Sequence, residues 1–178
     1  GGEVLLRGIC PSDLKVPLEE FQKAGAAVDA DEENCQIRIC MRKRPLPLLI
    51  KTEPYPGFPT DLQSPFMAFL ATALGTSYIE EQVFEGRFAT AKILEQMGAV
   101  IRTENQRAVI EGHYPLKGAA VNACDLRGGA ALMVAALAAE GDTFIGECHH
   151  IERGYEDICR DMAALGAHIR WVENDFTR

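Results

Sequence analysis

The sequence predicts a domain that mixes helices and strands and uses one supersecondary unit three times. A Gly-Ala pair recurs after three helix-like segments, at Gly25, Gly98 and Gly166, with about 70 residues between successive copies. Each pair follows an amphipathic segment and precedes a segment rich in β-formers. Self-similarity at such a period is typical of repeated modules. Periodicity alone leaves both an α/β and an α+β architecture open.

The middle copy, about residues 51–115, shows the whole unit. A capping box of Thr60 and Gln63 predicts the start of its opening helix, which should end at Gly75. Pro65 lacks an N–H donor, so the helix should begin later or bend there. We expect elements in the order helix, strand, helix, strand, strand, over residues 60–75, 77–84, 88–97, 100–103 and 108–111.

The other two copies follow the same order. In the third, about residues 116–178, we expect helices over 125–139 and 155–165 and strands over 143–147 and 168–172. The first, about residues 1–50, has the strand and second helix, but its opening helix would lie before Gly1. We therefore expect a piece of a longer protein. A proline-rich stretch, 42–57, joins the first two copies as a strand or extended crossover. Such units suggest small helix-backed sheets around a pseudo-threefold axis.

Composition excludes several functions. A formal net charge of −8 argues against a nucleic-acid-binding surface. The longest apolar runs are shorter than the ~20 residues that cross a membrane, and no signal peptide is recognisable, so we expect a cytoplasmic protein. The six cysteines form no CxxC pair and no zinc-type spacing with histidine, which indicates reduced thiols. His149 and His150 are adjacent on an expected strand and would point to opposite faces, so no metal site is predicted.

Charged residues at expected helix starts are the best candidates for a functional site. Asp61 and Arg87 in the second copy are separated by as many residues as Arg127 and Arg153 in the third. Threefold packing would bring these positions to one end of the domain, where arginines and helix N–H groups suit a phosphate. One carboxylate among them can serve as a base. The alternatives are that Asp61 only caps a helix and that Arg127 is a solvated surface residue.

Four motifs in fixed order give the sequence a family resemblance. They are Pro-Tyr-Pro-Gly-Phe-Pro-Thr-Asp at 54–61, Val-Phe-Glu-Gly-Arg-Phe at 83–88, Asp-Leu-Arg at 125–127 and His-Ile-Glu-Arg-Gly-Tyr-Glu at 150–156. Together they resemble the C-terminal half of UDP-N-acetylglucosamine enolpyruvyl transferases, in the EPSP synthase-like superfamily. The resemblance covers essentially the whole chain. It implies one of two inside-out, barrel-like α/β domains, each made of three units, with the active site between them.

The resemblance also implies a reaction. The enolpyruvyl group of phosphoenolpyruvate moves to the 3-hydroxyl of UDP-N-acetylglucosamine with release of phosphate, the first committed step of peptidoglycan synthesis, without metal or redox cofactor. Asp61 matches the aspartate proposed to accept the hydroxyl proton. Arg127 and Arg153 match arginines that hold phosphoenolpyruvate, and Arg87 matches an arginine near the sugar. Val83 matches a position that binds the nucleotide sugar, and Phe84 is next to it. The substrate-binding positions that the resemblance implies are therefore Val83, Phe84, Arg87, Arg127 and Arg153.

The sequence departs from the family pattern at several points. No cysteine lies in a segment resembling the loop whose cysteine is proposed to protonate the enolpyruvyl carbon, and that loop belongs to the other, N-terminal domain. The chain alone is therefore predicted to be inactive. Gly128 and Gly129 are expected to loosen the helix start after Arg127. Two alternatives remain, the shikimate branch of the same fold and a non-catalytic ligand-binding module.

Overall fold

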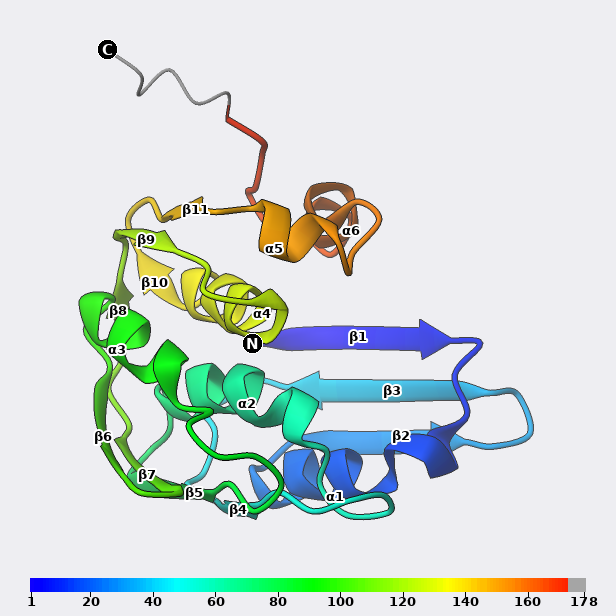
Figure 1. Cartoon of the computed structure of the whole chain (residues 1–178). Helices are drawn as coiled ribbons and strands as arrows, with labels where there is room; N and C mark the ends of the chain where they lie inside the picture. The colour runs from blue at the N-terminus through cyan, green and yellow to red at the C-terminus, as the bar shows by residue number, and fades with distance from the viewer. Residues whose placement is uncertain (173–178) are drawn as a thin grey trace.

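A computed structural model describes residues 1–172 of the chain, in which helices and strands alternate (Figure 1). The end of the third expected repeat, 173–178, lies outside the described residues. The helices are the short 3₁₀ segments η1 (Pro11–Leu14) and η2 (Thr60–Leu62) and the α-helices α1 (Lys15–Lys23), α2 (Gln63–Leu70), α3 (Ala89–Gln96), α4 (Leu126–Ala136), α5 (His149–Glu152) and α6 (Ile158–Ala164). The strands are β1 (Gly2–Arg7), β2 (Ala27–Asp31), β3 (Gln36–Met41), β4 (Leu49–Lys51), β5 (Thr76–Glu80), β6 (Val100–Glu104), β7 (Arg107–Glu111), β8 (Leu116–Lys117), β9 (Ala120–Asn122), β10 (Ala139–Glu140) and β11 (Phe144–Gly146).

The two larger sheets share one connectivity. In the first copy, β1 pairs with the far strand of the β2–β3 hairpin, giving the order β1-β3-β2. In the second copy, β5 pairs in the same way with the β6–β7 hairpin, and β4 adds a parallel edge strand. β1 leads to the β2–β3 hairpin through α1, and β5 leads to the β6–β7 hairpin through α3. The structure thus confirms the predicted strand–helix–strand–strand order in these copies.

The three Gly-Ala pairs end their helices in the same way. Gly25, Gly98 and Gly166 have φ values of +100°, +84° and +93°, a left-handed conformation that glycine adopts without a Cβ penalty. In every copy the next alanine donates its N–H to the carbonyl five residues back, as Ala26 to Phe21, Ala99 to Leu94 and Ala167 to Met162, at 2.9, 3.1 and 3.0 Å. The repeated helix stop predicted from sequence is therefore present in all three copies.

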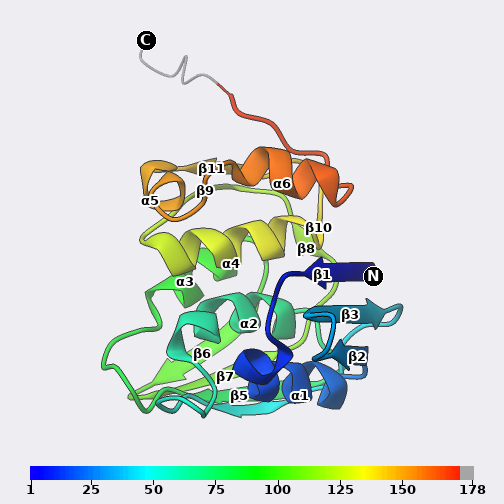
Figure 2. The same ribbon diagram turned by 90° about the vertical axis from the view of Figure 1, so that its right-hand side faces the viewer.

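The interior is organised around α2 and α4, which lie against each other in both ribbon views (Figures 1 and 2). The four-stranded sheet closes one side of this pair, while β9, β11, α5 and α6 form a layer beyond α4 (Figure 2). The main core is therefore shared between the copies, and its fully buried members include Leu70, Ile79, Leu94, Ile110 and Leu132. None of the described helices is long and apolar enough to cross a membrane.

Leu94 on α3 provides a test of this core. Its side chain is completely buried, and its carbonyl accepts the N–H of Ala99 at the helix stop. Leu94→Ala should lower the free energy of unfolding by about 2–5 kcal/mol, measured by urea denaturation, because the deletion leaves a cavity. As a control, Leu137→Ala removes a side chain that is 60% exposed and should change it by less than about 0.5 kcal/mol. Equal effects of the two substitutions would contradict the described core.

The start of the second copy differs from the prediction. The expected capping box of Thr60 and Gln63 does not form, because the Thr60 hydroxyl instead bonds to Glu81 and Arg87. A 3₁₀ turn comes first and α2 begins only at Gln63, so the later start expected from Pro65 is confirmed. The helix ends at Leu70, earlier than predicted. The expected strand 77–84 stops at Glu80, because the N–H groups of Gln82, Val83 and Phe84 bond to side chains, those of Thr52 and Glu81, rather than to a neighbouring strand.

The third copy departs further from expectation. The helix expected over 155–165 is present as α6, but a short additional helix, α5, precedes it, so His149 and His150 lie on a helix with ring centroids 4.0 Å apart and not on a strand. Residues 168–172 were expected as a strand, yet they pair with no strand in the described part of the chain. The backbone N–H and C=O groups of a strand need a neighbouring strand to bond to, and the apolar residues of a segment do not by themselves provide that neighbour. All six cysteines are free thiols.

Candidate active site

Three of the predicted site residues meet at one point. Asp61 comes from η2, Arg87 from the loop before α3, and Arg127 from the first turn of α4. Arg127 donates from Nε and Nη2 to the two Asp61 carboxylate oxygens, at 3.0 and 2.7 Å, and Arg87 Nη2 lies 3.5 Å from Asp61 Oδ1. The equal sequence spacing therefore corresponds to a real convergence, although the aspartate pairs with both arginines.

A solvent-open hollow of about 400 Å³ surrounds this cluster. Two loops and a helix start form it, and its walls are Glu53, Pro54, Tyr55, Pro59, Thr60, Asp61, Val83, Phe84, Arg87 and Arg127. The walls thus include every predicted site residue except Arg153. They combine the two cations Arg87 and Arg127, exposed aromatic rings and the two carboxylates Glu53 and Asp61, so a ligand there meets both charged groups and an apolar surface.

Arg87 is fixed by three contacts. Its Nη1 donates to the Thr60 hydroxyl at 2.6 Å, its Nη2 faces Asp61, and its guanidinium carbon lies 4.7 Å from the centre of the Phe84 ring. A cation over an aromatic face is attracted by the ring quadrupole. Arg87 therefore joins the loop that carries Phe84 to the turn that carries Asp61.

The start of α4 is firmer than the sequence suggested. Asp125 caps the helix by accepting the Gly128 N–H at 2.7 Å. The glycines do not loosen this turn, because close packing requires them: a Cβ on Gly129 would lie 2.4 Å from Ile151 Cγ1. The first turn therefore holds a defined position and directs Arg127 toward Asp61.

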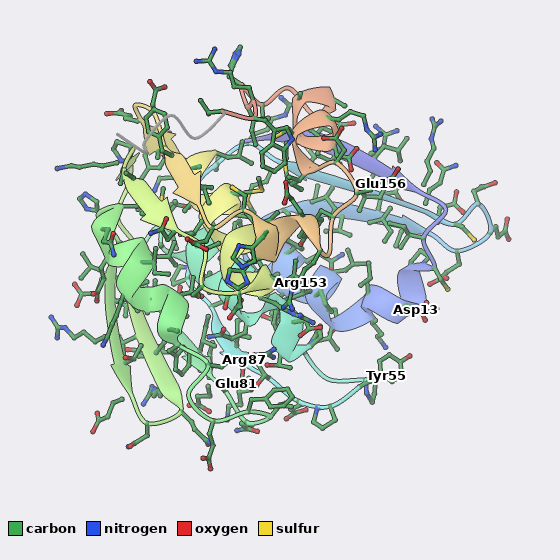
Figure 3. The ribbon with its side chains drawn as sticks, turned by 45° about the horizontal axis from the view of Figure 1, so that its top comes forward. Asp13, Tyr55, Glu81, Arg87, Arg153 and Glu156 are labelled. Atoms are coloured by element: carbon green, nitrogen blue, oxygen red, sulfur yellow. The ribbon has the colours of Figure 1, made fainter. Side chains whose placement is uncertain are left out.

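Arg153 occupies a different setting from the one predicted. It is the C-cap residue of α5, not a residue at a helix N-terminus. Its side chain forms no ion pair with any residue in the described range. Figure 3 shows Arg153 below α5 and also labels Glu81 and Arg87. It does not line the hollow, so its role stays a prediction.

The two arginines set the charge state of Asp61. Hydrogen bonds from Arg127, aided by the charges of both arginines, lower the pKa of the Asp61 carboxyl below that of an ordinary aspartate. The same contact raises the pKa of Arg127. The Asp61 side chain is 54% exposed, so burial does not reverse the effect. While Arg127 contacts it, Asp61 is an ionised but weak base.

This pairing has a measurable pH dependence. Because the Asp61 pKa is lower folded than unfolded, its stabilising contribution is present above the unfolded-state pKa and is lost as the pH falls through the folded-state pKa. In a carbon NMR titration, the Asp61 carboxyl should therefore titrate below the normal aspartate range, and Arg127→Ala should move its pKa upward. An Asp61 pKa that Arg127→Ala leaves unchanged would contradict the described ion pair.

Comparison with known proteins identifies the family of the chain. The EPSP synthase (3-phosphoshikimate 1-carboxyvinyltransferase) family matches residues 1–162. The chain belongs to this family. Among curated members, the UDP-N-acetylglucosamine 1-carboxyvinyltransferase of Desulfofundulus thermocisternus is 46% identical over 169 residues, covering 94% of this chain and 68% of that protein. A protein of that name from Legionella pneumophila is 44% identical, covering 97% of this chain but 34% of its own length. The chain spans only part of the curated relatives it matches.

Solved structures of EPSP synthase family members agree with the fold. The enolpyruvyl transferase NikO from Streptomyces tendae superimposes with a TM-score of 0.85 at 29% identity, over 95% of this chain and 40% of that one. An EPSP synthase from Acinetobacter baumannii superimposes with a TM-score of 0.73 at 19% identity, over 97% of this chain and 40% of that one. The second likeness concerns the fold alone. Both place this chain among EPSP synthase-like proteins of mixed helix and strand content.

One buried residue of the site was missed in the sequence. Glu81 is 1% exposed and lies two residues before Val83. Alternation along the strand carried a usable signal, since Ser77, Ile79 and Glu81 share one face and all three are buried. No group of His, Cys, Asp and Glu suited to a metal ion occurs among the residues that the structure describes.

Proposed function

We propose that this chain is one domain of a cytoplasmic UDP-N-acetylglucosamine enolpyruvyl transferase of peptidoglycan synthesis, with its three units around a pseudo-threefold axis. The observation that carries the proposal is the hollow in which Asp61, Arg87 and Arg127 converge beside Val83 and Phe84. The curated relatives at 43–46% identity are named for the same transfer. Five of the six residues that the resemblance implies, all except Arg153, line this one hollow, which supports the proposal.

Each substrate has a matching part of the hollow. The nucleotide sugar lies along Val83 and the exposed Phe84 ring, with its 3-hydroxyl at Asp61 and Arg87 nearby. The planar guanidinium of Arg127 suits the carboxylate or phosphate of phosphoenolpyruvate, since arginine binds such groups through two parallel hydrogen bonds. Arg153 completes the anion site when the domains close. In a protein of net charge −8, only such focused cations can attract two anionic substrates.

Asp61 acts as the base only after Arg127 has left it and the sugar 3-hydroxyl has taken its place. An incoming anion competes for Arg127, and loss of that contact raises the basicity of the carboxylate. Asp61 then accepts the 3-hydroxyl proton as that oxygen bonds to the central carbon of phosphoenolpyruvate, whose terminal carbon gains a proton from a group on the N-terminal domain. Loss of phosphate and of a proton from that terminal carbon restores the double bond. Without the second domain the hollow stays open to water and lacks the acid.

A phosphate-release assay tests the proposal. The complete enzyme should release phosphate when phosphoenolpyruvate and UDP-N-acetylglucosamine are both present, and the 178-residue chain should release none. Shikimate 3-phosphate in place of the nucleotide sugar should give no release. Preference for that acceptor would assign the chain to the shikimate branch. Phosphate release by the chain alone would contradict the proposal that its active site needs a second domain.

A further inference from the structure

Glu81 is a buried carboxylate at the floor of the candidate site. It follows the last residue of β5 and is 1% exposed, and Figure 3 shows it next to Arg87. An unpaired charge at this depth is costly unless hydrogen bonds replace its water. Neither Lys nor Arg lies within ion-pair distance of Glu81 among the described residues. The family resemblance gives it no role.

Four donors satisfy this carboxylate. Oε1 accepts the Thr52 hydroxyl at 2.8 Å and the backbone N–H groups of Val83 and Phe84 at 3.0 and 3.1 Å. Oε2 accepts the Thr60 hydroxyl at 2.9 Å. Two of the donors are thus backbone groups of the proposed sugar-binding pair. A third donor, the Thr60 hydroxyl, belongs to the residue immediately before Asp61.

These bonds belong to a closed ring of contacts. Thr60, which donates to Glu81, accepts from Arg87 Nη1 at 2.6 Å. The Arg87 guanidinium lies over the Phe84 ring, and the Phe84 N–H returns to Glu81. The ring therefore fixes the loop, the turn and the arginine relative to one another. Arg127 lies outside it and reaches it only through Asp61.

We propose that Glu81 is a positioning residue that shapes the acceptor side of the site. Its carboxylate draws the Val83–Phe84 backbone inward and, through Thr60, sets the orientation of Arg87 beside Asp61. Resting on the proposed function, the inference is that Glu81 governs binding of the nucleotide sugar and not of phosphoenolpyruvate. Glu81 itself touches no substrate, because the residues it orients lie between it and the hollow.

Two substitutions in the complete enzyme separate the parts of this network. Glu81→Gln preserves size but replaces one acceptor oxygen by an NH₂ group, so Thr60 loses its acceptor and the loop bonds lose their charge. Glu85→Gln is the matched control, because Glu85 is exposed in the same loop. Thr60→Val removes the hydroxyl that links Glu81 to Arg87 but keeps the bonds from the Val83 and Phe84 N–H groups to Glu81, and Thr60→Ser restores that hydroxyl.

Two readouts are required, one of them independent of activity. In Glu81→Gln, hydrogen exchange at the Val83 and Phe84 amides should accelerate by about tenfold, because charge-assisted bonds become neutral ones. The KM for UDP-N-acetylglucosamine should rise by about tenfold while the KM for phosphoenolpyruvate changes less than about twofold. Thr60→Val should raise the same KM but leave exchange at both amides unchanged. Thr60→Ser should lower the KM for UDP-N-acetylglucosamine relative to Thr60→Val, because it restores the hydroxyl, and Glu85→Gln should match the parent enzyme.

The outcomes discriminate clearly. Unchanged amide exchange in folded Glu81→Gln would overturn the proposal. Both KM values rising together with a fall in Tm would also overturn it, because that pattern indicates a merely structural residue. If Glu81→Gln does not fold, the Thr60→Val and Thr60→Ser pair decides through the two KM values. If the parent enzyme released no phosphate, the proposed function would fail, while the amide exchange would still report whether Glu81 orders the loop.

Discussion

Replacing Arg127 by alanine in the complete enzyme should lower kcat/KM for phosphoenolpyruvate by about 10²–10³-fold, the loss typical of removing one charge-stabilising donor. Arg127 lies at the proposed anion site, where its two donors hold the Asp61 carboxylate at 3.0 and 2.7 Å. The effect should appear in titrations of phosphoenolpyruvate at saturating nucleotide sugar. Phosphate release under those conditions is the measurement.

Two variants control this experiment. Arg127→Lys keeps the charge but loses the bidentate geometry, so it should recover only part of the lost kcat/KM. Arg102→Ala removes an arginine side chain that is 79% exposed on β6, paired with Glu111 and away from the hollow, and should leave the kinetics unchanged. Full activity in Arg127→Ala would remove this residue from the anion site.

Asp61→Asn should lower kcat by about 10²–10⁴-fold, the range that general acid–base catalysis contributes. Asparagine preserves the shape and one hydrogen-bonding oxygen, yet it cannot accept the proton. The loss should therefore persist at saturating concentrations of both substrates. Asp142→Asn, at an exposed position outside the hollow, serves as the control. Unchanged kcat in Asp61→Asn would leave Asp61 only an orienting role.

The helix stops and sheet pairings were the most predictable parts of the fold. Gly25, Gly98 and Gly166 could be recognised because a left-handed helix end needs a residue without Cβ, whatever the tertiary context. The β6–β7 hairpin followed from two β-rich runs separated by a short polar turn. The short helix α5 was not predicted, because the apolar spacing over 155–165 that indicated α6 does not extend back to residues 149–152.

The site was predictable where sequence spacing reflected repeated structure. Asp61 and Arg127, which occupy corresponding places in neighbouring copies, converge with Arg87 as expected, whereas Arg153, the counterpart of Arg87, does not line the hollow. Their pairing was not foreseen, since contacts across about 66 residues of chain depend on tertiary packing. The Thr60 capping interaction was predicted wrongly for a related reason. Its hydroxyl found a stronger acceptor in the buried carboxylate of Glu81 than in its own helix.

The most direct test is a structure of the complete enzyme with UDP-N-acetylglucosamine and a non-reactive analogue of phosphoenolpyruvate. The sugar 3-hydroxyl should lie within hydrogen-bond distance of Asp61, against Val83 and Phe84. Arg127 should have left Asp61 for the carboxylate or phosphate of the analogue. An intact Asp61–Arg127 pair with both ligands bound elsewhere would contradict the proposed site.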